Sequence, residues 1–210
     1  MIKMVIFFRR KAGMNSAAFR EHWRTKHAAL IVALPGIRRY VQNYPLESAS
    51  LGGEPVFDAV AESSFDDTQA MKALARTPEY AAVLADEPNF IDGASMGSII
   101  TEERVLKDGA APAGGVKRIG FVARQAQMPI DEFFRLWLEH GERCARSAAL
   151  RRYAQCHVRR SIYDAGRTPA FDGAAMGWYD GVEALNAAAD DKFGDPQRWR
   201  QLIASERVVA

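Results

Sequence analysis

The sequence contains an internal repeat, and a repeat of this length restricts the fold to one built from two similar units. When the chain is shifted by 114 positions against itself, identical residues coincide. The coinciding pairs are Lys3 with Lys117, Phe7 with Phe121, Arg10 with Arg124, Met14 with Met128, Phe19 with Phe133 and Trp23 with Trp137. A second block follows, in which FDAVAESSFDD at 57–67 lies over FDGAAMGWYDG at 171–181. Two units, each of about half the chain, are therefore expected.

Between these two blocks the offset falls to 113, which aligns the RRY triplet at 38–40 with the RRY triplet at 151–153. A deletion of one residue after Trp137 explains the change, and it places His140 over His27. His27 follows its tryptophan by four residues, and His140 follows its tryptophan by three. Both spacings keep the histidine on the helical face that carries the tryptophan.

The boundary between the units lies in a segment rich in glycine, alanine and proline. Residues 107–115 read KDGAAPAGG, which is typical of a flexible connector. We therefore expect an N-terminal unit at 1–106, a linker at 107–115 and a C-terminal unit at 116–210. The C-terminal unit is shorter, because it lacks 11 residues that correspond to the surroundings of residues 78–90.

Each unit reads as the element order β-α-β-β-α-β. In the N-terminal unit a short apolar strand at 4–8 precedes a helix that begins after the N-capping pair at 15–16. The strand with RRYVQN follows, then a strand with alternating polarity at 56–65, a second helix capped by Asp66, and a last strand at 97–105. The C-terminal unit repeats this order, which is that of ferredoxin-like folds.

An antiparallel sheet of this order carries helices on one face only, so its other face needs a cover. The simplest cover is the sheet of the second unit, packed face to face about an approximate two-fold axis. The predicted fold class is therefore α+β, with two ferredoxin-like (βαββαβ) units packed sheet to sheet in one chain.

The composition fits a soluble globular protein, and we expect neither nucleic acid nor a membrane as a partner. The formal net charge is +2, and lysine and arginine are scattered apart from short arginine pairs. The apolar start of the chain is too short for a signal-peptide core or a membrane span. Cys144 and Cys156 are too few for a disulfide framework, so a reducing, cytoplasmic location is expected.

Taken together, these residues resemble the EthD family of dimeric α+β barrel proteins. The resemblance covers residues 1–106 and rests on the elements W-x-x-x-H, P-G-x-x-x-Y and D-E-x-x-F, which begin at positions 23, 35 and 86. The C-terminal unit is similar but degenerate: it keeps Trp137, His140 and Tyr153 and lacks the Pro-Gly pair. The resemblance implies a tandem-duplicated pseudo-two-fold barrel, with a pocket between the sheet and the helices of each unit.

His27 is the first candidate functional residue. It shares a stripe with Phe19, Trp23 and Leu30 on one helical face, where it is either a tolerated core residue or the polar group of an apolar pocket. The resemblance favours the second interpretation, because this histidine is the most recognisable polar position of the family. A neutral imidazole, with its pKa lowered by burial against Trp23, is suited to general acid or base chemistry near pH 7.

The following strand supplies Tyr40 and Asn43. They are three positions apart and so lie on opposite faces of a regular strand. A phenol near an imidazole can donate to a developing oxyanion or enolate, which makes Tyr40 the better catalytic candidate. A half-buried tyrosine and an edge amide are the structural alternatives. Catalysis is assigned to His27 and Tyr40.

Other candidates belong to the expected pocket. Asp86 and Glu87 either orient His27 or only cap a turn, and Phe90 is either a pocket wall or core. The predicted substrate-binding residues are Trp23, Asn43, Asp86, Phe90, His140 and Tyr153.

No metal site is predicted. His22 precedes His27 by five residues, about 140° around a regular helix, so the two should not share one face. His140 and Cys144 are i,i+4 neighbours, but a cysteine in such a place is more often a small apolar residue than a nucleophile. The arginines of the RRY triplets are expected to lie at a solvated sheet edge or to form salt bridges between the units, rather than to bind an acidic substrate.

The residues and the resemblance lead to one main hypothesis. The protein performs cofactor-independent acid–base catalysis of the lyase, decarboxylase or isomerase type on a small hydrophobic aromatic or polyketide-like metabolite, with His27 active and His140 a remnant. Relatives implied by the resemblance leave two alternatives. One is a non-catalytic binding or accessory protein for an oxygenase or degradation pathway, and the other is a haem- or oxygen-dependent oxidoreductase. The chain is expected to form an intrachain pseudo-dimer and can associate further as a homodimer.

Overall fold

The computed structural model describes residues 1–46, 55–188 and 192–210, and its contacts divide the chain into two compact units. Unit 1 consists of Met1–Pro45, Phe57–Ile100 and Glu206–Ala210, and unit 2 consists of Leu46–Val56 and Thr101–Ser205. The boundaries proposed at 106 and 116 follow the repeat in the sequence, and as domain boundaries they stay a prediction.

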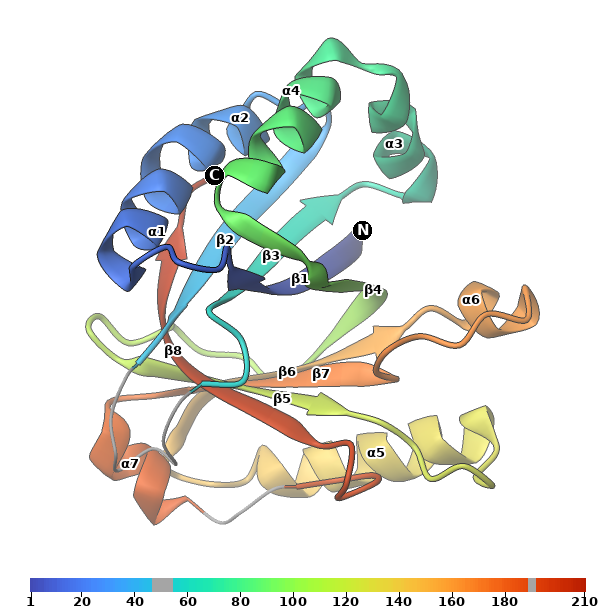
Figure 1. Ribbon diagram of the computed structural model, residues 1–210. Coiled ribbons are helices and arrows are strands. Elements are labelled where there is room, and N and C mark those ends of the chain that lie inside the picture. Colours follow the sequence, from blue (N-terminus) through green and yellow to red (C-terminus); the bar gives the residue numbers. More distant parts are fainter. Residues whose placement is uncertain (47–54, 189–191) are drawn as a thin grey trace. The chain divides into compact units, whose positions relative to one another are not determined.

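Unit 1 is an antiparallel sheet with helices on one face (Figure 1). Its strands are β1 (Ile2–Arg10), β2 (Ile37–Pro45), β3 (Ala59–Phe65) and the first part of β4 (Ile91–Lys107). β3 lies between β1 and β2, and the register places Ala61 opposite Ile6 and Ser63 opposite Tyr40. The strong apolar and β-branched content of β1 explains why this short segment is a buried strand.

The helical part of unit 1 is more broken than a simple βαββαβ pattern requires. Its elements are α1 (Ser16–His22), the π-helical turn η1 (Trp23–His27), α2 (Ala28–Val32), α3 (Thr68–Ala73), the 3₁₀ turn η3 (Leu74–Arg76), α4 (Pro78–Asp86) and the 3₁₀ turn η4 (Glu87–Asn89). The Asn15 side chain caps α1 by accepting from the amide of Ala18 at 2.8 Å, as predicted. Asp67, and not Asp66, caps α3.

The π-helical turn changes which residues of the first helix face the core. Phe19, Trp23 and His27 are buried as predicted, but the buried residues of α2 beyond His27 are Ala28 and Ile31, while Leu30 is only half-buried. A π turn holds one residue more than an α turn, so every later residue shifts by one position around the axis. The expected stripe therefore ends at His27.

The core of unit 1 is a cluster of aromatic rings beneath these helices. Phe8 of β1 makes edge-to-face contacts with Trp23 and Phe90, at centroid distances of 5.6 and 6.1 Å. Gly36, with φ at +79°, ends the first helical run in the left-handed conformation and turns the chain into β2. This turn starts the strand that carries Tyr40.

Unit 2 has a similar plan with fewer helices. Its elements are the second part of β4, β5 (Val116–Val122), α5 (Ile130–Cys144), β6 (Leu150–Val158), α6 (Arg160–Asp164), β7 (Gly173–Tyr179), α7 (Val182–Ala187) and most of β8 (Arg200–Val208). The strand order is β8–β5–β7–β6–β4, and neighbouring strands in this order pair antiparallel. The long helix α5 lies along one face of this sheet (Figure 1) and is a regular α-helix throughout.

Aligned positions of the two units make the same contacts. Arg38 chelates Asp66 through Nε at 3.0 Å, and Arg151 chelates Asp180 through Nε at 2.9 Å. Both are exposed pairs within one unit, which fits the expected solvated edge and not the salt bridges expected between the units. A glutamine amide donates to the carbonyl of the helix tryptophan in both units, at 2.7 Å in unit 1 and 2.8 Å in unit 2. Such recurrence supports the interpretation of the chain as a tandem repeat.

Among the residues that the structure describes, no helix is both long enough and apolar enough to cross a membrane.

The C-terminal residues belong to unit 1, and their removal should destabilise it. The amide of Tyr40 donates to Ala210 and the carbonyl of Tyr40 accepts from Val209, both at 2.9 Å, while Arg207 donates to the carbonyl of Arg24 and to Gln42. At about 1 kcal/mol for each lost bond, deletion of 206–210 should cost about 2–4 kcal/mol and lower Tm by roughly 5–15 °C. Thermal unfolding measures this loss. Arg207→Ala removes only two of the bonds and should cost less; an unchanged Tm on deletion would contradict the pairing.

Candidate functional site

Unit 1 contains a cavity of about 160 Å³ between its sheet and its helices. Strands β1, β2, β3 and β4 line it together with the π turn, α2 and α4. Its walls are mainly apolar: Met4, Ile6, Phe8, Trp23, Ile31, Leu34, Phe65, Leu74, Val83 and Ile91. Six polar lining residues are His27, Tyr40, Ser63, Tyr80, Glu87 and Ser98. Met96 and Ser98 are exposed lining residues and place the opening of the cavity on the β4 side.

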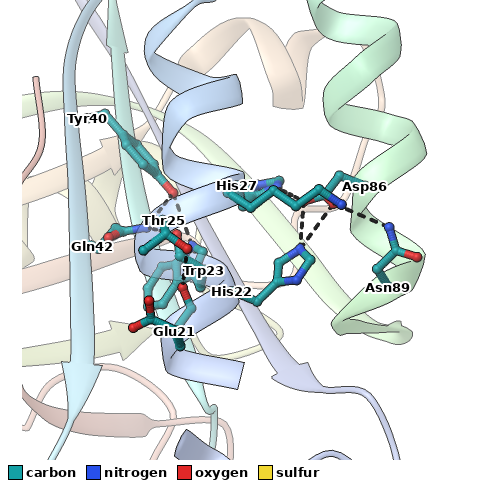
Figure 2. Close-up of polar contacts among 10 residues, drawn as sticks. Glu21, His22, Trp23, Thr25, His27, Tyr40, Gln42, Asp86 and Asn89 are labelled. Carbon is teal, nitrogen blue, oxygen red and sulfur yellow. Dashed lines mark hydrogen bonds and ion pairs between the residues drawn. The ribbon is translucent and has the colours of Figure 1, made fainter. Parts of the chain in front are cut away.

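His27 presents one ring nitrogen to Asp86. Its Nδ1 lies 3.1 Å from Oδ2 of Asp86 (Figure 2). The imidazole packs at 4.7 Å from the ring of Phe90. Burial lowers the pKa of His27, and the hydrogen bond and charge of Asp86 oppose this only in part. The imidazole is therefore neutral at pH 7. Because a carboxylate only accepts, the proton lies on Nδ1, and Nε2 carries the lone pair of a base.

Asp86 gathers four donors. Besides His27, both His22 and Asn89 contact this carboxylate (Figure 2): His22 Nε2 lies 2.9 Å from Oδ2, and the Asn89 amide donates to Oδ1 at 3.3 Å. Lys26 is the fourth donor, with its Nζ 2.9 Å from Oδ1. Burial raises the pKa of this carboxyl, but the hydrogen bonds from Lys26, His22, Asn89 and His27 outweigh burial and hold the pKa well below its usual range. Asp86 is thus a fixed anion that orients His27 from behind the cavity wall.

The π turn makes this arrangement possible and overturns one expectation. The amide of Ala28 reaches back to the carbonyl of Trp23, an i→i+5 bond, and the Thr25 hydroxyl donates to the carbonyl of Glu21 at 2.7 Å. In such a turn residues five apart lie on one face. His22 and His27 therefore meet at the same carboxylate, whereas the regular helix assumed from the sequence would separate them. Such turns are frequent at functional sites.

Tyr40 lies at the same cavity as a buried, neutral phenol. Its hydroxyl accepts from Trp23 Nε1 at 3.1 Å and from Gln42 Nε2 at 3.4 Å. Burial raises the pKa of Tyr40 above its usual value, against the effect of these two donors. Within the part of the chain that the structure describes, the hydroxyl proton has no acceptor. Its two lone pairs are occupied, so the group is left as a donor for a ligand.

A family model for the EthD domain matches residues 11–94, which include the π turn, Tyr40, Asp86 and Phe90. This part of the chain is thus similar to an EthD domain. No curated protein matches this sequence. An EthD family protein from Bacillus halodurans is 28% identical over 50% of this chain and 99% of its own, with a TM-score of 0.43.

Two further solved structures match nearly the whole chain. A putative monooxygenase from Fusobacterium nucleatum is 12% identical, with a TM-score of 0.62, over 100% of this chain and 92% of its own. An anthrone oxidase-like protein is 11% identical, with a TM-score of 0.66, over 99% of this chain and 93% of its own. At these identities the likeness shows the fold alone. The fold class is α+β, of ferredoxin-like units as in dimeric α+β barrels, as predicted.

The EthD domain brings together only part of the predicted site. Trp23, His27 and Tyr40 line the cavity. Asp86 and Phe90 do not line it; they hold His27 in place from behind. Asn43 faces away from Tyr40, as expected for residues three apart, and its amide nitrogen donates to the carbonyl of Val60 and to Glu62. A role for Asn43 in substrate binding stays a prediction.

The aligned residues of unit 2 have different surroundings. His140 Nε2 lies 3.3 Å from Cys144 Sγ, and its ring packs at 5.1 Å from Phe193. Tyr153 is fully buried. A cavity of about 370 Å³ in unit 2 is lined by Gln125, Met128, Leu136, Lys192, Phe193, Gly194, Pro196 and Trp199, and its lining includes neither His140 nor Tyr153. Their assignment to substrate binding stays a prediction as well.

Two further residues lie at this site: His22, which shares Asp86 and was not predicted, and Glu87, which lines the cavity and was considered only for orienting His27 or capping a turn. The one-residue difference between the repeats is the signal that could have revealed the π turn and hence His22. In the described parts of the chain, no cluster of three or more His, Cys, Asp or Glu residues has the arrangement to hold a metal ion.

His157 is a second buried histidine, in unit 2. Its ring lies 4.3 Å from that of Trp137, and Nε2 lies 3.0 Å from Oε1 of Gln155. Nδ1 is buried and has no hydrogen-bond partner among the described residues. Burial is the main cause that lowers the pKa of His157 to about 3, and the charge of Arg104 is the second cause.

Replacement of Asp86 should lower the pKa of His27 further. The carboxylate raises this pKa through its hydrogen bond and its charge, so Asp86→Asn should lower it. An NMR titration of the His27 ring measures the change. Asp66→Asn, which alters an exposed ion pair with Arg38, is the matched control and should leave His27 unchanged. An equal or higher pKa in Asp86→Asn would refute the pairing.

His157 should make the protein less stable in mild acid. Its pKa is near 6.5 when unfolded and about 3 when folded, so between these values the unfolded chain binds more protons. Stability is therefore lost as the pH falls below 6.5, by about 2 kcal/mol between pH 7 and pH 5. Denaturant unfolding of His157→Phe should show a shallower pH dependence than the wild type. His140→Gln is the control, and equal slopes in His157→Phe and the wild type would contradict the assignment.

Proposed function

We propose that this EthD domain performs acid–base catalysis without a cofactor, in a lyase, decarboxylase or isomerase step on a small hydrophobic aromatic or polyketide-like molecule. The observation that carries the proposal is the pair of His27 and Asp86 at the wall of an apolar cavity. The carboxylate fixes the tautomer of the imidazole. Its unprotonated nitrogen is then available to a molecule in the cavity.

The size and lining of the cavity support an aromatic ligand. An engineered apolar cavity of about 150 Å³ binds benzene. The cavity of about 160 Å³ next to His27 is therefore the size of one aromatic ring, and its exposed mouth at Met96 and Ser98 leaves room for a longer molecule to extend outward.

In this proposal His27 and Tyr40 have complementary tasks. His27 Nε2 removes a proton from carbon or oxygen of the substrate, and Asp86 stabilises the imidazolium that forms. The Tyr40 hydroxyl, polarised by Trp23 and Gln42, donates to the oxygen on which negative charge develops. The surrounding apolar walls exclude water and strengthen both interactions.

Two other functions compete with this proposal. A non-catalytic protein that binds the same metabolite, or assists an oxygenase, would use the same cavity. An oxidoreductase is suggested by the names of the monooxygenase and anthrone oxidase-like structures. For a haem-dependent version this cavity does not fit, because a haem has four pyrrole rings and the cavity has the volume of one aromatic ring.

The two histidines provide the test. If His27 is the proton-transfer group, His27→Gln should lower turnover of a single-ring β-keto acid or enolisable ketone by about 10²–10⁴, with an unchanged fold. His140→Gln should change turnover by less than about tenfold, because His140 does not line the cavity that holds His27. Mass spectrometry of molecules that co-purify with the protein would identify the substrate series.

Equal losses in the two variants, or a larger loss in His140→Gln, would overturn the assignment of the EthD domain as the active half. A binding protein would show weaker ligand affinity in His27→Gln with no turnover in any variant. That outcome would replace the catalytic proposal by the binding function.

A further inference from the structure

Asp86 and Glu87 are adjacent carboxyl groups with different surroundings. Asp86 receives hydrogen bonds from His22, Lys26 and His27, outside the lining of the cavity. Glu87 begins the 3₁₀ turn after α4 and lines the cavity itself. Its side chain has no hydrogen bond or ion pair with any residue that the structure describes. A half-buried carboxyl group in a cavity wall is therefore available to whatever fills the cavity.

We propose that Glu87 is a second proton-transfer residue of this cavity and that its substrates are ring ketones that undergo enolisation. This inference rests on the proposed function and narrows it from three reaction types to an isomerisation. The geometry requires contact with both groups, since a molecule that fills a cavity the size of one ring touches His27 and Glu87 together.

The surroundings of Glu87 favour its acid form. Burial raises the pKa of Glu87, and the neighbouring charge of Asp86 raises it further. The other ionisable side chains that line the cavity are the imidazole of His27 and the phenols of Tyr40 and Tyr80. Lys26 pairs with Asp86, and Lys11 donates to the carbonyl of Pro88. A neutral base and a carboxyl group whose acid form is favoured make the complementary pair that enolisation needs.

The reaction balances without a further reactant. His27 Nε2 takes the proton from the carbon next to the carbonyl group, the electron pair of the C–H bond forms the C=C bond of the enol, and Glu87 delivers its proton to the carbonyl oxygen. The imidazolium of His27 then returns a proton to carbon, and Glu87 takes back the proton from the enol oxygen. The proton returns either to the same carbon atom or, in a conjugated substrate, to the carbon at the far end of the conjugated system. Both residues return to their starting states, and the product is the substrate itself or its double-bond isomer.

Hydrogen exchange of 2-indanone in D₂O tests this inference. Its CH₂ protons exchange only through the enol, and ¹H NMR follows their loss; quenching of Trp23 fluorescence measures binding of the ketone. The wild type should accelerate the exchange, and His27→Gln should abolish the acceleration. Glu87→Gln should lower the exchange rate by about 10–100-fold with little change in binding. Glu79→Gln, on the first turn of α4, is the matched control and should exchange as the wild type does.

The pH profile separates a proton donor from a structural residue. In the wild type the rate should fall as the pH rises through the pKa of Glu87, because the acid form is lost. Glu87→Gln cannot ionise, so this falling limb should disappear. A limb that persists in Glu87→Gln, with exchange still dependent on His27, would overturn the inference and leave the proposed function in place. A bound ketone that the wild type does not exchange would overturn both, and absence of binding would overturn the substrate class.

Discussion

The candidate site depends on the extra residue in the π-helical turn from Trp23 to His27. An α-helix would place His22 and His27 on different faces, so only one of them could reach Asp86. The π turn brings residues five apart onto one face, and both imidazoles then contact the same carboxylate. The same turn shifts the buried residues after His27 by one position, which seats Ile31 at the cavity. One inserted residue therefore determines both the polar pair and part of the apolar wall.

The Asp86 carboxylate contacts both histidines that the π turn brings together, and it thereby affects the acid–base properties of His27. A buried carboxylate is costly unless it is paired and hydrogen-bonded. Lys26 supplies the positive charge, and the two histidines and Asn89 supply further donors, so the anion persists beside an apolar cavity. His27 in turn is neutral because burial outweighs the attraction of Asp86. Because Nδ1 of His27 is held by the Asp86 carboxylate, Nε2 is the nitrogen that carries the lone pair, and it is available to a molecule in the cavity that His27 lines.

Much of the fold follows from the sequence, since the repeat, the Asn15 cap and the burial of Phe19 and Trp23 all depend on local pattern. The π turn does not, because periodicity arguments assume 3.6 residues per turn throughout. Comparison of the two repeats shows the additional residue, but it indicates a deletion in one copy as readily as a π turn in the other. Glu87 was unpredictable for another reason. Which of two adjacent carboxyl groups faces a cavity is decided by the 3₁₀ turn that follows α4, a tertiary feature.

Some contacts occur in both units and belong to the fold, whereas other features belong to the candidate site of unit 1. Both units hold the helix tryptophan by a glutamine amide and the RRY strand by an arginine–aspartate pair. These contacts join helix to strand and strand to strand, and they recur whether or not a π turn is present. The π turn, Asp86, Glu87 and Phe90 occur in unit 1, and the last three come from the segment that the second repeat lacks. Unit 2 has its sheet and helices without the π turn, Asp86 and Glu87, so the presence of these three features in unit 1 is explained by the cavity they serve. Phe90 also belongs to the aromatic core of unit 1.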